Sequence, residues 1–270
     1  MKVKVVVSKE AQLASLLYRS HIINLDPLFF QFLDFKLAKL VYTFRSKCLE
    51  GKGKEFLLGI LDKKIKVDYK IEWFEEIKEE LIELKNKFEG FYNEKIEEAL
   101  EIIKETFLIK KFPNEVEVYL VYNLSPTISF GSALVYKDRY IIFQSAGKNE
   151  RRSVEEKFSG FLHELLHILF DYNEINLPPD FEEVLIDLFV PNGLLDVKLG
   201  FKLYEQIKNK LLSIPEKESE KYQKYKKYYD CLLKILVNYN FSKNVWEYIL
   251  ENVKDEKIKE IAKEVLEKLS

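Results

Sequence analysis

Residues 153–172 read SVEEKFSGFLHELLHILFDY, and this stretch largely decides how the chain can fold. Its apolar residues recur at helical spacing, and Ser153 and Glu156 are spaced as a capping box, so we expect one helix over the whole stretch. Within it, residues 163–167 read HELLH. Because residues four apart share a helix face, the two imidazoles can bind one Zn²⁺ while Glu164 reaches a water molecule beside it.

The alternative explanation for His163 and His167 is a pair of core histidines on an amphipathic helix, since their neighbours are strongly apolar. The chain contains only three histidines, and such a motif arises by chance in roughly half a percent of chains of this composition. Burial of the helix is also compatible with a metal, because a dry cavity makes a bound metal useful. We therefore interpret both histidines as metal ligands and Glu164 as a general base.

A third ligand is needed, because catalytic zinc usually has three protein ligands and keeps one position for water. Paired prolines precede a second expected helix, which runs over about residues 181–190 and is capped by Asp180. This helix places Glu183 and Asp187 one turn apart on one face, with Glu182 about a quarter-turn away. A solvated acidic face is the simpler explanation, but the rest of the helix is apolar, and a buried carboxylate needs a cation.

We therefore prefer Glu183 as the third ligand, with Glu182 and Asp187 as alternatives. If Glu183 binds the metal, Asp187 can accept a hydrogen bond from the non-metal nitrogen of a ligand histidine. Metals other than zinc stay open, since imidazole and carboxylate ligands accept several divalent ions.

Charge and cysteine content argue against several classes of protein. Lysine plus arginine (43) nearly balance aspartate plus glutamate (45), which argues against a nucleic-acid partner. Cys48 and Cys231 lie far apart and indicate neither a disulfide framework nor a cysteine zinc site. The apolar stretch at the N-terminus is too short for a signal peptide, and no apolar run has the length of a membrane span. We expect a cytoplasmic protein without a membrane partner. Its composition resembles that of thermophile proteins. The sequence does not predict the oligomeric state.

The hydrophobic periodicity predicts an α+β chain that is mostly helical, with a small β-sheet packed on the HELLH helix and additional N- and C-terminal helices. Residues 1–175 would form an N-terminal lobe, and residues 176–270 a helical C-terminal lobe with the third-ligand helix, together making one catalytic unit. A long helix is expected over about residues 72–110. Strands are expected at residues 2–7, 64–70, 116–122, 129–136 and 139–144.

The HELLH sequence followed by Glu183, with Asp187 four residues later, resembles the gluzincin branch of the zincin metallopeptidases over about residues 116–190. The resemblance implies a small sheet before the motif helix, an edge strand that pairs with extended peptide substrate, and a mostly helical lobe across the cleft. It implies that this edge strand lies within Ser129–Tyr136. The interval between His167 and Glu183 is shorter than in thermolysin-like members.

The resemblance also implies a tyrosine or histidine that hydrogen-bonds the developing oxyanion. No histidine follows His167, so a tyrosine would have to serve. The candidates by position are Tyr172, Tyr204, Tyr228 and Tyr229.

The leading hypothesis is a zinc metallopeptidase, a hydrolase that acts on a peptide or protein substrate with Glu164 as general base. One alternative is a non-catalytic zincin-like binding or regulatory protein, and another is a helical interaction protein without metal. The presence of Glu164 favours the enzyme, because a structural zinc site needs no proton acceptor and usually fills all four positions with protein ligands.

Overall fold

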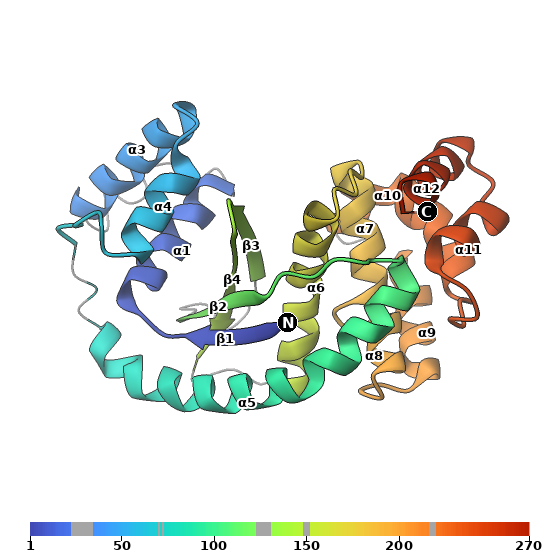
Figure 1. Cartoon of the computed structure of the whole chain (residues 1–270), viewed down its shortest axis with the longest axis horizontal. Helices are drawn as coiled ribbons and strands as arrows, with labels where there is room; N and C mark the ends of the chain where they lie inside the picture. The colour runs from blue at the N-terminus through green and yellow to red at the C-terminus, as the bar shows by residue number, and fades with distance from the viewer. Residues whose placement is uncertain are drawn as a thin grey trace. The chain divides into compact units, whose positions relative to one another are not determined.

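The computed structural model describes residues 1–22, 35–69, 71, 73–122, 131–147, 152–215 and 220–269. These residues are mostly helical and include one small mixed sheet, which confirms the expected α+β class. The chain forms two compact units. The sheet unit consists of Val3–Gly90 and Glu115–Arg151, and the helical unit of Met1–Lys2, Phe91–Asn114 and Arg152–Ser270. The long helix α5 (Phe74–Phe107) contributes residues to both units (Figure 1).

The sheet has four strands in the order β1-β2-β4-β3. Their bounds are Lys2–Val6 for β1, Glu115–Tyr122 for β2, Gly131–Tyr136 for β3 and Arg139–Ala146 for β4. β2 and β4 are parallel, whereas β3 and β4 form an antiparallel hairpin whose closing pair is Tyr136 and Arg139. The strands expected in these four places are confirmed in their described parts. β3 lies at an edge of the sheet, as the edge-strand expectation requires.

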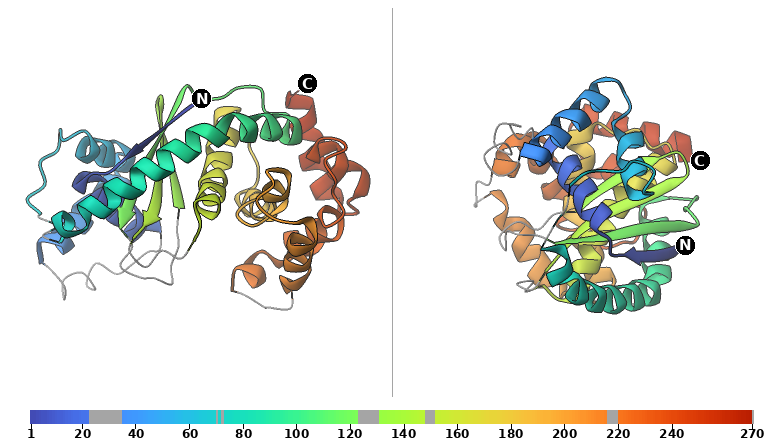
Figure 2. Two further views of the ribbon diagram at one scale, coloured as in Figure 1. Left: turned by 90° about the horizontal axis from the view of Figure 1, so that it is seen from below. Right: turned by 90° about the vertical axis from the view of Figure 1, so that its left-hand side faces the viewer.

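Three helices share one core with this sheet: two of them contact its strands, and the third packs against those two (Figures 1 and 2). They are α1 (Lys9–Ile22), α3 (Phe35–Leu49) and α4 (Gly53–Leu61). Alternate residues of the central strands supply the sheet side of this core, since alternate side chains of a strand share a face. These residues are Tyr119, Val121, Ile141 and Phe143. The side-chain amide of Gln12 joins α1 to the end of β2, because it both donates to and accepts from the backbone of Tyr122.

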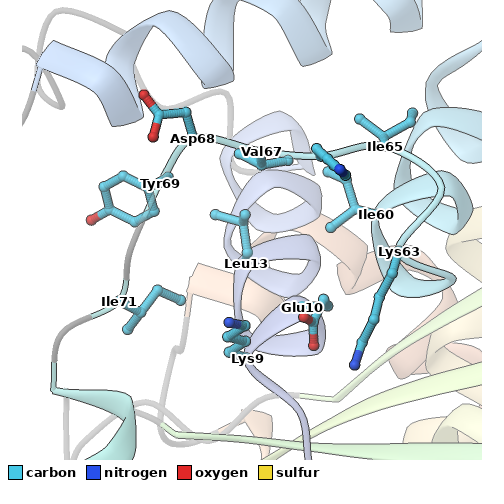
Figure 3. A pocket seen from close by; sticks show the side chains of 11 residues that line it. Lys9, Glu10, Leu13, Ile60, Lys63, Ile65, Val67, Asp68, Tyr69 and Ile71 are labelled. Carbon is cyan, nitrogen blue, oxygen red and sulfur yellow. The ribbon is translucent and has the colours of Figure 1, made fainter.

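The strand expected at residues 64–70 is wrong for its described part, residues 64–69, which form no strand. Ile65, Val67 and Tyr69 pack against the core formed by α1, α3 and α4, so burial of one side of an irregular segment explains their alternation. The same segment, with α1 and α4, lines a hollow of about 410 Å³ (Figure 3). The described residues of its lining include Lys9, Lys63 and apolar side chains, and none of these described residues is a histidine or a cysteine.

The helical unit contains the remaining helices. They are α6 (Val154–Tyr172), α7 (Pro179–Phe189), α8 (Leu194–Lys198), α9 (Tyr204–Ser213), α10 (Glu220–Leu236), α11 (Val245–Asn252) and α12 (Glu256–Leu269). Aromatic rings fill its core, where the buried Trp246 indole donates to the carbonyl oxygen of Phe107 at 2.8 Å. The lobe boundary expected near residue 175 falls inside this unit, because α6 and α7 pack together. Among the described helices, none is long and apolar enough to cross a membrane.

The starts of α6 and α7 use different chemistry. Ser153 caps α6 as expected: its side chain accepts from the backbone N–H of Glu156, and the Glu156 carboxylate accepts from the backbone N–H of Ser153. The expected cap of α7 by Asp180 is wrong, since α7 begins at Pro179 without a side-chain cap. Proline suits this position because its missing N–H is one that the first turn would leave unpaired.

Candidate metal centre

Helices α6 and α7 run antiparallel in the helical unit. Two hydrogen bonds show this direction. Glu182 accepts from His167, and the carbonyl of Val190, about two turns later in the chain, accepts from His163, which lies one turn before His167 on α6. Glu183 therefore lies between the two histidines, whose ring centroids are 5.1 Å apart. The structure thus brings together the two predicted histidine ligands and the preferred carboxylate.

The Nδ1 atom of each histidine is already engaged. His163 Nδ1–H donates to the carbonyl oxygen of Val190 at 3.0 Å, and His167 Nδ1–H donates to Glu182 Oε1 at 2.6 Å. The Nε2 atoms face Glu183, at 3.8 Å from Oε1 for His163 and 3.3 Å from Oε2 for His167. Metal-binding histidines typically have this arrangement, with one nitrogen donating to a carbonyl or carboxylate and the other free to bind.

The spacing of these atoms fits a metal ion. One potential ligand atom from each of His163, His167 and Glu183 lies within 4.8 Å of the other two. Ligands held about 2.0–2.1 Å from a tetrahedral zinc lie about 3.3 Å apart. The His167 Nε2 to Glu183 Oε2 distance already has this value. In the described part of the chain, no other group of three histidine, cysteine or acidic side chains has comparable spacing.

The charges at this site are strongly coupled. Burial lowers the pKa of His167, but hydrogen bonds to Glu182 and Glu183 and the charge of Glu164 outweigh burial and raise the pKa to about 10. For Glu183, burial raises the pKa, but the hydrogen bond from His167 and the charge of Lys221 hold it well below its ordinary value. Without metal, His167 is therefore an imidazolium beside the ionised carboxylate of Glu183. A metal ion would replace its Nε2 proton.

Asp187 lies beside His163, although its closest partners are on α10. Its Oδ1 is 3.6 Å from His163 Nδ1, whose hydrogen goes to the Val190 carbonyl. Its Oδ2 accepts from the Tyr229 hydroxyl at 2.7 Å and lies 2.5 Å from Lys221 Nζ. Asp187 thus joins the candidate centre to α10.

The candidate tyrosines differ in their surroundings. Tyr229 reaches the centre through Asp187. Tyr204 donates instead to the carbonyl oxygen of Val237 at 2.6 Å, and Tyr228 packs edge-on against Phe181. Of these three tyrosines, Tyr229 is the one that donates to a carboxylate beside the centre, that of Asp187.

Sequence patterns did not identify three partners of the centre. Glu182 is one of the alternative ligands by sequence, but in the structure its carboxylate accepts from Nδ1 of His167. Val190 lies at the C-terminal end of α7, where backbone carbonyls have no partner within the helix. A predicted helix end at this position could therefore have indicated a carbonyl that is available to a histidine. Lys221, 38 residues after Glu183, gave no local signal, yet its Nζ donates to Glu183 Oε1 at 2.7 Å.

Comparison with protein-family models, curated proteins and solved structures finds no match to this chain. The functional interpretation therefore depends on the geometry and chemistry of the centre itself.

Proposed function

We propose that the chain is a zinc-dependent peptidase of the gluzincin type, in which His163, His167 and Glu183 bind the metal and Glu164 is the general base. The supporting observation is that both histidines have Nδ1 held by an acceptor and Nε2 directed at one carboxylate.

A zinc ion held by these side chains would lower the pKa of a water molecule toward neutrality and polarise the carbonyl of a peptide. Glu164, directly after His163 on α6, accepts the proton of the attacking water and passes it to the leaving nitrogen. Only 9% of Glu164 is exposed, so bulk water competes little for its carboxylate. Glu182 and the Val190 carbonyl hold a hydrogen on Nδ1 of each histidine, so that Nε2 is the nitrogen that would bind the metal once His167 has lost its Nε2 proton.

The substrate class we propose is a peptide or protein, and the proposed location is the cytoplasm. Cys48 and Cys231 are both free thiols, which supports a reducing compartment. Burial raises the pKa of both thiols, so neither is suited to act as a nucleophile that would replace the metal chemistry.

The test is zinc content by elemental analysis of protein purified without a metal-chelate column. We expect about one zinc per chain in the wild type and a large loss in Glu183→Ala, with His163→Ala as the emptied control. The zinc-loaded protein is then incubated with a peptide library and the products are identified by mass spectrometry. Absence of zinc even after its addition would contradict the proposal. Zinc without cleavage of any peptide would favour the non-catalytic binding or regulatory alternative.

A further inference from the structure

Lys221, on the first turn of α10, binds a carboxylate of the candidate centre without occupying a ligand position. Its Nζ donates to Glu183 Oε1 at 2.7 Å and lies 2.5 Å from Asp187 Oδ2. The Tyr229 hydroxyl, two turns further along α10, donates to the same oxygen of Asp187. Lys221 is thus held by two carboxylates, one of which belongs to the preferred ligand.

The two oxygens of Glu183 therefore have different partners. Oε1 accepts from Lys221 and lies 3.8 Å from His163 Nε2, whereas Oε2 lies 3.3 Å from His167 Nε2, the spacing of two ligands on one tetrahedral metal. A carboxylate that binds a metal through both oxygens must direct both toward the ion. The hydrogen bond from Lys221 competes with a metal for Oε1, whereas Oε2 has no such bond from Lys221, so Oε2 is the more available donor oxygen of Glu183.

We propose that Lys221 determines the metal preference of this centre by restricting Glu183 to one donor oxygen. This inference rests on the proposed metal site. Two histidines and a single carboxylate oxygen leave one position of a tetrahedron for water, which suits Zn²⁺. Mn²⁺ prefers a larger number of oxygen ligands and gains more from a carboxylate that binds through both oxygens.

A simpler role for Lys221 would be to contribute positive charge. A nearby ammonium repels every dication, so its removal would strengthen the binding of Zn²⁺ and Mn²⁺ by similar factors. The ratio of the two dissociation constants cancels this common effect. It therefore reports on the geometry of the ligands and not on the local charge.

The experiment measures dissociation constants for Zn²⁺ and Mn²⁺ by competition with a fluorescent chelator in metal-free full-length protein. Lys221→Met removes the ammonium and keeps a chain of similar length. Lys221→Arg retains a charged donor that can still bind both carboxylates. Lys227→Met is the matched control: it removes one charge from the same helix, where Lys227 lies 3.8 Å from Asp255. Circular dichroism melting of each variant verifies its folding.

We expect Lys221→Met to reduce the preference for Zn²⁺ over Mn²⁺ about 10-fold or more, within the range typical for groups that orient metal ligands. Lys221→Arg and Lys227→Met should keep the wild-type ratio. The visible absorption of Co²⁺-loaded protein gives a second readout, since its bands should weaken in Lys221→Met as the coordination number rises.

An unchanged ratio in Lys221→Met, with both metals bound more tightly, would overturn the inference and leave Lys221 as a source of charge only. An unchanged Co²⁺ spectrum would also count against it. Failure of the proposed metal site would be recognised separately, because the wild-type protein itself would then bind neither metal.

Discussion

The orientation of the two histidines depends on the groups behind them. His163 donates to a backbone carbonyl and His167 to a carboxylate, so each ring is held by a different kind of acceptor. The carboxylate of Glu182 forms a charge-assisted hydrogen bond, which is stronger than a bond to a neutral carbonyl. His167 is therefore the more firmly oriented of the two histidines.

Glu182→Ala should weaken zinc binding about 10- to 100-fold, because His167 loses the acceptor that fixes its ring. Titration with a chelator of known affinity measures the change. Asp180→Ala is the control, since it removes an exposed acid from the first turn of the same helix. Equal zinc affinity in Glu182→Ala and Asp180→Ala would exclude a positioning role for Glu182.

Glu164→Gln should reduce peptide cleavage by about a hundred- to ten-thousand-fold while zinc content stays at the wild-type level. The amide keeps the shape of the side chain but cannot take a proton from water. Cleavage is measured on a peptide found in the library screen, and zinc is measured on the same sample. Loss of zinc in Glu164→Gln would mean that Glu164 holds the metal and is not the base.

At the scale of elements, β3 is less available to a peptide than a bare edge strand. The carbonyl oxygens of Ala133 and Val135 accept from the Tyr18 hydroxyl and Lys54 Nζ, each at 3.0 Å. Both donors come from helices of the same unit. A peptide that extended the sheet at this edge would have to displace them, because it needs the same carbonyl oxygens.

The start of α8 is joined to α6 by a buried carboxylate. Asp196 is 1% exposed, and its Oδ2 accepts from the Ser159 hydroxyl at 2.8 Å and from the backbone N–H of Gly193 at 3.2 Å. Its Oδ1 has no hydrogen-bond partner within the described part of the chain. Burial raises the pKa of this carboxyl, although its hydrogen bonds oppose the shift.

This raised pKa predicts how stability depends on pH. The folded protein holds the Asp196 proton more tightly than the unfolded chain does. The contribution of this proton to the free energy of unfolding is therefore complete at low pH and is lost as pH rises through the pKa of Asp196 in the folded protein. Asp196→Asn keeps an acceptor oxygen and has no charge. Relative to the wild type, its free energy of unfolding should rise between about pH 3 and about pH 7.

Urea unfolding of wild type and Asp196→Asn at both pH values tests this expectation. Asp171→Asn, which changes an exposed acid near the end of α6, is the control. If the difference in free energy of unfolding between wild type and Asp196→Asn is the same at both pH values, the charge of Asp196 does not limit stability.

At the scale of the whole molecule, zinc binding should be linked to folding, because its ligands come from two helices that are brought together only in the folded helical unit. Zinc at about 100 times its dissociation constant contributes about 2.7 kcal/mol. For a chain of this size a chelator should then lower Tm by about 5–10 °C. Calorimetry with and without chelator measures the shift. His163→Ala should show little change, and an equal shift in that variant would indicate metal binding elsewhere.

The sequence determined the local features of the centre. Ser153 and Glu156 fix where α6 begins, and the four-residue spacing of His163 and His167 fixes their common face, since both depend only on helix geometry. Glu183 was preferred among three acids by the same reasoning, and the structure brings it to the histidines. The alternation at residues 64–69 predicts a strand that the structure does not contain, because one-sided burial of an irregular segment produces the same pattern.

The tertiary structure decided what surrounds these residues. The antiparallel packing of α6 and α7 sets which nitrogen of each histidine is held by Glu182 or the Val190 carbonyl. The packing of α10 on α7 brings Lys221 to Glu183 across 38 residues of sequence. Hydrogen bonds and ion pairs act over a few ångströms in space, and the periodicity of one segment contains no information about which distant side chain will lie within that range.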